Sequence, residues 1–429
     1  TIPMGILQSS SLQGDYTATM WLSIALFAFL RWRLVRCWGW TLMTGSALGL
    51  ACLSKGTAPA FSLPILLWMV LSSLRKDPAK GLWHFFVVLA LILLIQAPFF
   101  LRNFPLRNEP VSKVQIQGVM VDRPSVDTLA ANFVRNMATH MSVGIQEVND
   151  KGIAFLGQGF QKLGLDLNPS RSGFGNYKFT LPKRSTSDDT AANPLHFFLV
   201  LVLSVGLFWP RRFSAGLKKY WVCLLFMMIV LSWFIRWQPW ISRFHLPFFV
   251  LSAAWMAVTL DRMRSVRWKA LVVVLFLVMA IPFLTHGFPR RMMGRKSMLR
   301  SPRIARHYMY DHSAYLIAKA VVDMVRSSPC RDIGLIISND GWESPWWALL
   351  NAAKEGYRIE HVLVSNGLEK APYPLGPFAP CLVIVDPDRI ADEEGMRGQG
   401  FAKVRTVTFG PRAVSLYMDP RMFVGQGRP

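Results

Sequence analysis

Charged side chains are scarce in this sequence. They make up 17% of the 429 residues, against roughly a quarter in an average soluble domain. Acidic residues are particularly few, with 25 Asp and Glu against 48 Lys and Arg. Hydrophobic residues account for 52% of the chain and include 16 Trp and 29 Phe. This composition is typical of a membrane protein rather than of a soluble one.

The sequence also lacks the motifs of common metal, nucleotide and transport sites. Neither GxGxxG nor a Walker A loop is present, so no nucleotide site is expected. No internal repeat or matching pair of Gly/Pro-broken spans is visible, which argues against a transporter. The cysteines form no CxxC and no Cys/His cluster, so we expect no zinc site and no bound cofactor. They are Cys37, Cys52, Cys223, Cys330 and Cys381.

What the sequence has instead is a series of long apolar runs. Several are shorter than the ~20 residues that cross a bilayer, so some of the helices are expected to be tilted or partly buried. The pattern predicts a mainly α, polytopic transmembrane helical bundle of about eight spans. The runs lie near residues 16–31, 39–54, 57–74, 82–101, 195–209, 219–236, 244–260 and 269–286.

Basic residues gather in alternate short loops between these runs. The positive-inside rule places such loops in the cytoplasm, and it accounts for the net charge of +23 better than nucleic-acid binding does. The other short connections hold only Lys55, Arg236 and Arg243. The basic loops contain Arg31, Arg33 and Arg36, then Arg75, Lys76 and Lys80, then Arg211, Arg212, Lys218 and Lys219, and last Arg262, Arg264, Arg267 and Lys269.

This orientation divides the chain into four parts. Residues 1–101 hold spans one to four, and residues 195–286 hold spans five to eight. Residues 102–194 form an extracytoplasmic loop, and residues 287–429 form a soluble domain on the same side. Seven basic side chains at 290–306 oppose this placement, but long domains translocate largely regardless of charge. We therefore expect a multi-pass membrane protein whose long loop and C-terminal domain lie outside the cytoplasm.

The long loop contains one helical pattern, over residues 125–145. Val126, Leu129, Phe133, Met137 and Met141 recur at steps of three or four, which is the spacing of an amphipathic helix. Two placements fit this pattern. The helix lies on the membrane surface or over a cavity, or it packs within a small extramembrane subdomain.

The C-terminal part reads as a small α/β domain. Strands are predicted at 333–338, 361–364 and 381–386, and a helix at 346–355. Cys330 and Cys381 would be able to pair in an oxidising compartment. Asp386 ends an apolar strand, where α/β sites often lie, although an Asp before a Pro is more commonly a turn residue.

Ionisable residues at the outer membrane edges are the candidates for chemistry, because their burial in lipid is costly. Asp15 precedes the first run, and three roles fit a carboxylate there: a base, a metal ligand or a helix cap. Lys55 either holds a lipid phosphate or extends to the headgroups. Arg102, Arg243 and His245 face the same compartment, where cations suit a pyrophosphate or phosphodiester. Each of these three also suits simple anchoring of its helix at the interface.

The segments that hold these residues resemble bacterial GT-C glycosyltransferases, the family related to protein mannosyltransferases and aminoarabinose transferases. QSSSLQGDYTATMWLSIALFAF, GLACLSKGTAPAFSLPILLW and APFFLRNFPL look like successive segments of that family. STSDDTAANPLHF and SRFHLPFF resemble motifs at the starts of later spans. The resemblance rests on the order of these segments rather than on any single motif.

The resemblance implies an activity. GT-C enzymes transfer a sugar from a polyprenyl-phosphate donor to an acceptor at the outer face of the membrane. By this resemblance Asp15 lies near the active cavity, and Lys55, Arg102, Arg243 and His245 are candidates for the donor phosphate. The partners implied are membrane lipid and the lipid-linked sugar, with no nucleic acid, while any need for a divalent metal stays open.

The chain departs from the family at its beginning. GT-C enzymes hold their principal catalytic carboxylate in the first outer loop, and that loop is absent here. The chain is therefore expected either to be part of a longer protein or to have lost its catalytic half. In the second case it would be an inactive structural subunit, associated with other membrane subunits. Asp188 and Asp189 are paired carboxylates near the membrane, and we expect them to cap and solvate the following span rather than to catalyse.

Overall fold

The computed structural model describes residues 1–75, 77–107, 118–181, 185–206, 213–262, 265–337, 341–364, 372–385, 393–409 and 412–420. The chain forms two compact units, Thr1–Met292 and Met293–Pro429. Five residues named above lie outside the described part of the chain. They are Lys76, Arg211, Arg212 and Arg264 of the predicted cytoplasmic loops and Asp386.

In its described residues the first unit is mainly helical, and each predicted apolar run overlaps a helix. Among these residues, four helical segments are long and apolar enough to cross a membrane, namely Pro78–Pro105, Ala215–Phe234, Ile241–Asp261 and Val266–His286. These four indicate a multi-pass membrane protein, whereas crossing by all eight helices stays a prediction. The eight are α2 (Asp15–Leu34), α3 (Trp38–Ser54), α4 (Ala58–Ser73), α5 (Pro78–Arg107), α9 (Pro194–Val205), α10 (Ala215–Phe234), α11 (Leu246–Asp261) and α12 (Val266–His286).

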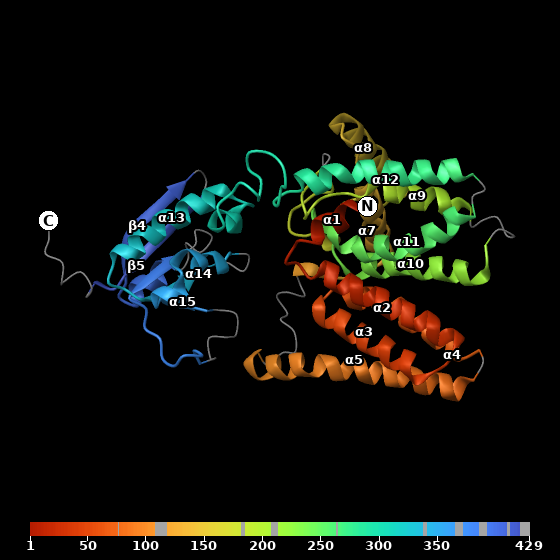
Figure 1. Cartoon of the computed structure of the whole chain (residues 1–429), viewed down its shortest axis with the longest axis horizontal. Coiled ribbons are helices and arrows are strands. Elements are labelled where there is room, and N and C mark those ends of the chain that lie inside the picture. Colours follow the sequence, from red (N-terminus) through yellow and green to blue (C-terminus); the bar gives the residue numbers. More distant parts are fainter. Residues whose placement is uncertain are drawn as a thin grey trace. The chain divides into compact units, whose positions relative to one another are not determined.

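Two glycines bring α3 and α5 into close contact. A Cβ atom on Gly45 would lie 3.1 Å from the Cα atom of Val88, and one on Gly49 would lie 3.1 Å from the Cβ atom of Ile95. The amide of Gln96 on α5 also donates a hydrogen bond of 2.8 Å to the carbonyl of Gly49. Small residues four apart are a common way for apolar helices to pack without polar side chains. Helices α2, α3 and α5 run side by side as a result (Figure 1).

The predicted helix in the long loop is confirmed, but it ends earlier than predicted, and its most deeply buried side includes polar residues. It forms α7 (Val126–Ala138), continues as one short 3-10 turn, η1 (Thr139–Met141), and is followed by α8 (Gln146–Lys162). Val126 and Met141, at the two ends of the apolar stripe, are exposed, while the polar residues Asn132 and Arg135 are fully buried. Phe133 and Met137, in the middle of the stripe, are partly buried against the core.

The reason for this orientation lies at the end of α10. A helix leaves its last carbonyls without partners, and the Asn132 amide donates to two of them, those of Ser232 and Ile235, at 2.9 and 3.2 Å. Asn136 donates to the Ser232 hydroxyl at 2.9 Å. Polar groups of α7 thus complete the hydrogen bonding of α10, and the apolar stripe is buried only in part.

The second unit is built on one mixed sheet with the strand order β2-β1-β3-β5-β4. β1 pairs in parallel with β2 and with β3, while β5 pairs antiparallel with β3 and with β4. Helix α13 (His312–Ser327) packs against β4 and β5. The strands are β1 (Asp332–Ile336), β2 (Arg358–His361), β3 (Leu382–Val385), β4 (Ala402–Phe409) and β5 (Arg412–Met418).

Predictions for this unit are partly confirmed. β1 and β3 lie where strands were predicted, but β2 begins three residues earlier than its prediction. The predicted helix 346–355 is two short helices, α14 (Ser344–Leu350) and α15 (Ala352–Glu355). The break is at Asn351, which takes a left-handed backbone conformation with φ of 48°. The last element before β4 is the short helix α16 (Glu393–Gly398).

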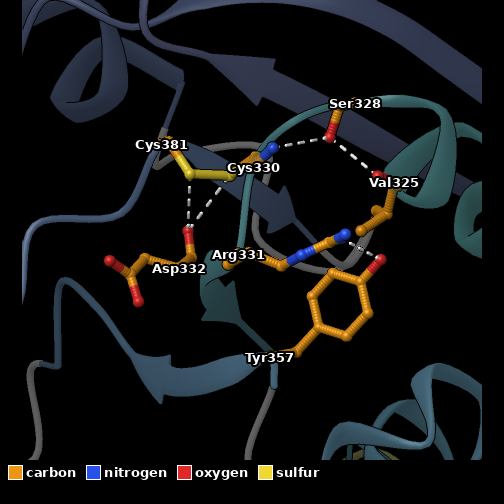
Figure 2. The surroundings of a disulfide bond; sticks show 7 residues. All are labelled: Val325, Ser328, Cys330, Arg331, Asp332, Tyr357 and Cys381. Atoms are coloured by element: carbon orange, nitrogen blue, oxygen red, sulfur yellow. Dashed lines mark hydrogen bonds between the residues drawn. A yellow bond between two sulfur atoms is a disulfide. The ribbon is translucent and has the colours of Figure 1, made fainter. Parts of the chain in front are cut away.

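A disulfide between Cys330 and Cys381 joins the residues just before β1 and β3 (Figure 2). The two Cα atoms are 5.7 Å apart, and the Cys381 amide donates to the Asp332 carbonyl at 3.0 Å. Beside the disulfide, Arg331 donates to the Tyr357 hydroxyl at 2.6 Å. Because disulfides persist in oxidising compartments, this bond is consistent with an extracytoplasmic location of the second unit.

Candidate functional site

The predicted residues Asp15 and Lys55 meet in an ion pair between the Asp15 carboxylate and the Lys55 ammonium. Asp15 is the first residue of α2, and Lys55 is the residue that ends α3. Gly14 allows the two helix ends to meet, since a Cβ atom there would lie 2.7 Å from the carbonyl oxygen of Ser54. Asp15 does not cap its helix through its side chain, because Gly14 holds the N-cap position.

Burial decides the electrostatics of this pair. Asp15 is 2% exposed, while the Lys55 side chain is 17% exposed. Burial lowers the pKa of Lys55, and the attraction of Asp15 opposes that shift. A buried carboxylate also benefits from lying at a helix N-terminus, where the backbone dipole is positive. Asp15 is therefore held by one cation and one helix end.

Arg243 lies beside this pair and has a carboxylate of its own. The Arg243 Nη1 atom donates to the Asp189 Oδ1 atom at 2.8 Å, and the Gln13 amide donates to the same oxygen at 3.0 Å. Both cations lie over the ring of Phe244. Its centroid is 4.8 Å from the Lys55 ammonium and 5.2 Å from the Arg243 guanidinium carbon.

The neighbouring Asp188 has a third cation. The Arg290 Nη2 atom donates to the Asp188 Oδ2 atom at 2.6 Å, and the Arg290 Nε atom donates to the Ser10 hydroxyl at 3.1 Å. Burial raises the pKa of Asp188 and outweighs the attraction of Arg290. Asp188 and Asp189 thus make ion pairs instead of capping α9, whose N-cap residue is Asn193.

We call these six residues the outer charge cluster. It joins three carboxylates to three cations, so the cluster is neutral when all six are ionised. An incoming anion would bind by taking over a cation from a carboxylate, which in turn would release that carboxylate as a base. The cluster consists of Asp15, Lys55, Asp188, Asp189, Arg243 and Arg290.

His245 lies close in sequence to Arg243 but is fully buried, so the expectation that it reaches the outer surface is wrong. It forms a hydrogen bond of 2.8 Å between its Nδ1 atom and the Nε2 atom of His140. The His140 Nδ1 atom accepts from the Asn193 backbone amide at 3.2 Å. Burial lowers the pKa of His140 well below its ordinary value.

These contacts determine where the imidazole protons are. A backbone amide only donates, so neutral His140 carries its proton on Nε2 and donates it to His245. His245 then carries its own proton on Nε2, a buried atom with no hydrogen-bond partner among the described residues. At His245 the site therefore offers a neutral donor rather than a cation.

Arg102 does not join the cluster. It lies on α5 with an exposed side chain, and the described residues include no ion-pair or hydrogen-bond partner for it. Five participants were not predicted as site residues from the sequence, namely Asp188, Asp189, Arg290, Gln13 and His140. The paired aspartates were visible in the sequence, but nothing in their spacing linked them to Arg243 or Arg290.

Within the described residues, no group of His, Cys, Asp and Glu side chains is arranged to hold a metal ion. No protein-family model, curated protein or solved structure matches the chain. The likeness to GT-C enzymes therefore stays a hypothesis based on the sequence.

Proposed function

We propose that this chain is a GT-C type membrane glycosyltransferase of the bacterial inner membrane. It moves a sugar from a polyprenyl-phosphate donor to an acceptor at the outer face, with eight spans and with the long loop and C-terminal domain outside. The observation that carries the proposal is the pairing of Asp15 with Lys55 beside Arg243, at one end of the helical unit. The resemblance supplies the reaction class.

The cluster suits this chemistry in two respects. Lys55 and Arg243 both lie over the ring of Phe244, which supports a shared role in holding the phosphate of a lipid-linked sugar. When the phosphate takes over Lys55, the Asp15 carboxylate is released beside it. Asp15 then accepts the proton of the acceptor hydroxyl as the new bond to the anomeric carbon forms. The bond to the donor phosphate oxygen breaks, and the phosphate leaves with the electron pair.

The supporting residues have different roles. Asp189 pairs with Arg243 until the donor phosphate replaces it, and the Phe244 ring packs against both Lys55 and Arg243. His245 adds a neutral N–H donor behind them. Arg102 is exposed on α5, and its assignment to the donor phosphate rests on the resemblance alone.

A second candidate is an inactive GT-C-derived structural subunit of a larger membrane complex. One observation favours it: every cation of the outer charge cluster already has a carboxylate partner. A network of matched charges is also what a purely structural site requires. Fixed stoichiometric copurification with unrelated membrane subunits, together with no turnover of donor, would support this candidate.

The test is donor consumption by the purified chain in lipid nanodiscs. Radiolabelled polyprenyl-phosphate sugars are supplied with membrane extract as acceptor, and released polyprenyl phosphate is measured. Lys55→Ala and Asp15→Asn should each reduce the rate at least tenfold, about 1.4 kcal/mol of transition-state stabilisation. The matched control is Arg326→Gln, which removes a cation from an exposed ion pair with Glu355 in the second unit. Wild-type rates in both site variants, with normal folding, would remove these residues from the site.

A further inference from the structure

The other end of α2 carries a second group of cations, which differs from the outer charge cluster. Arg33 and Arg36 lie at and just after the end of α2, and Arg75 follows α4. Arg33 and Arg36 both contact α4, at Trp68 and at the Ser72 carbonyl, and Arg75 follows the end of that helix. Among the described residues, none of the three has a carboxylate partner. We call these three residues the arginine site.

Packing and hydrogen bonds hold Arg36 of the arginine site in place. Arg36 donates to the Ser72 carbonyl at 2.8 Å, and its guanidinium carbon lies 4.2 Å from the centroid of the buried Trp32 ring. Its Nε atom is buried without a hydrogen-bond partner among the described residues. A Cβ atom on Gly81 would lie 2.9 Å from the Arg36 Nη1 atom, so only a glycine leaves room for this position.

Arg33 is held in a similar way. Its guanidinium carbon lies 4.8 Å from the centroid of the Trp68 ring, and Trp68 is only 9% exposed. Stacking on an aromatic face fixes the plane of a guanidinium while leaving its N–H donors free for an oxyanion. Two of the three cations are therefore oriented before any ligand binds.

Leucines next to the arginine site in the chain are exposed. Leu34, Leu71 and Leu74 are 74%, 53% and 51% exposed. A free phosphate ion has no use for such neighbours, whereas the acyl chains of a phospholipid would cover them. The 20 residues of α2 span about 30 Å, which separates the arginine site from Asp15 by roughly the hydrocarbon thickness of a bilayer.

We propose that Arg33, Arg36 and Arg75 form a binding site for the phosphodiester headgroup of an anionic phospholipid in the leaflet opposite the outer charge cluster. Guanidinium groups bind phosphate oxygens in pairs, and basic groups at the ends of spans attract anionic lipids of the cytoplasmic leaflet. The proposal does not depend on any glycosyltransferase activity.

The experiment counts bound lipid on the full chain by native mass spectrometry after titration with phosphatidylglycerol. Arg33→Gln combined with Arg75→Gln should weaken binding about tenfold or more. Arg75→Gln alone changes an exposed side chain and should weaken it by a smaller factor. The matched control, Lys80→Gln with Lys269→Gln, removes two cations from the same predicted side. Both already have carboxylates, Asp77 and Asp261, and the control should bind as the wild type does.

Three outcomes decide the proposal. Equal weakening in the arginine and lysine variants would overturn the site, because general charge would explain the binding. If zwitterionic phosphatidylethanolamine bound as tightly as phosphatidylglycerol does, the proposal would also be overturned. Inorganic phosphate that competes with phosphatidylglycerol and shows the same dependence on the arginines would overturn the lipid assignment and identify a free-phosphate site. Thermal unfolding of each variant verifies that the fold is retained.

Discussion

Removal of the Lys55 ammonium should destabilise the helical unit more than removal of both charges of the Asp15–Lys55 pair. Asp15 is 2% exposed, so Lys55→Met leaves a carboxylate buried without its cation. A buried charge that loses its partner costs about 3 to 5 kcal/mol. Asp15→Asn leaves the less buried Lys55 with a neutral neighbour, which should cost about 1 to 2 kcal/mol.

The double variant, Asp15→Asn with Lys55→Met, removes both charges at once. It should be less destabilised than the sum of the single variants by about 2 kcal/mol or more, because neither charge is left alone. The free energy of unfolding is measured by denaturant titration in mixed micelles, with tryptophan fluorescence as the signal. The control is the exposed pair Arg326–Glu355, with side chains 42% and 37% exposed, whose coupling should be below about 1 kcal/mol.

Additive effects at Asp15 and Lys55 would refute this reasoning, since they would mean that the two side chains do not interact in the folded protein. The measurement is also independent of turnover. A coupled pair with normal donor consumption in both single variants would establish a structural role alone.

Three further predictions concern other parts of the first unit. Burial raises the pKa of Asp188 above 3.8, so the native state binds this proton more tightly than the unfolded chain does. Its stabilising contribution is complete below pH 3.8 and is lost as the pH rises through the raised pKa. The unfolding free energy of the wild type minus that of Asp188→Asn should therefore increase as the pH falls from 7 to about 4, and a flat difference would contradict the shift. Burial lowers the pKa of Arg135 to about 10, so it stays charged at neutral pH, and its Nη2 atom donates bonds of 2.6 Å to both Asn132 and Ser172. Arg135→Lys keeps the charge but loses the planar guanidinium that lies 5.6 Å from the centroid of the Trp237 ring. It should cost about 2 kcal/mol in unfolding free energy, and a neutral result would mean that an ammonium group satisfies the same partners. Gly45→Ala should cost about 1 to 3 kcal/mol by overpacking α3 against α5, whereas the same substitution at Gly157, where a Cβ atom meets open space, should cost nothing, as thermal unfolding of the two variants would establish.

The positions of the eight apolar helices in the first unit were predictable from the sequence, because long apolar runs need helical hydrogen bonding in lipid. The side of α7 that packs deepest was not predictable in this way. The rule that apolar residues face the interior applies to a helix surrounded by water. It also leaves out the carbonyl groups at the end of α10, which need hydrogen-bond donors. Asn132 and Asn136 bind these carbonyl and hydroxyl groups, and no spacing within α7 reveals a partner a hundred residues away.

The candidate site was predictable only in part. Asp15, Lys55 and Arg243 were chosen because each is an isolated charge at a membrane edge, and the structure brings these three together. The sequence did not reveal which carboxylate belongs to which cation. Arg243 pairs with Asp189, 54 residues away, and Arg290 pairs with Asp188, 102 residues away. His245 was expected at the surface because its neighbour is charged, but the 3-10 turn η4 (Ile241–His245) leads it into the interior.

The C-terminal unit shows the same limit. β1 and β3 are buried apolar strands, so composition alone predicts them. β4 is exposed along nearly its whole length, and its polar residues carry no core signal. It is a strand because β5 pairs with it, which is information that a single segment does not contain.

The Cys330–Cys381 bond closes a covalent ring around one part of the second unit. The ring contains β1, α14, α15 and β2, while β3, β4 and β5 follow it in the chain. A protease that cuts the backbone once between residues 331 and 380 would therefore not release a fragment, because the bond still joins the two pieces. Such a cut is visible on a denaturing gel only after reduction. A chain that migrates as one band without reductant and as two with it would thus report both an intact disulfide and a cleaved backbone in the same molecule.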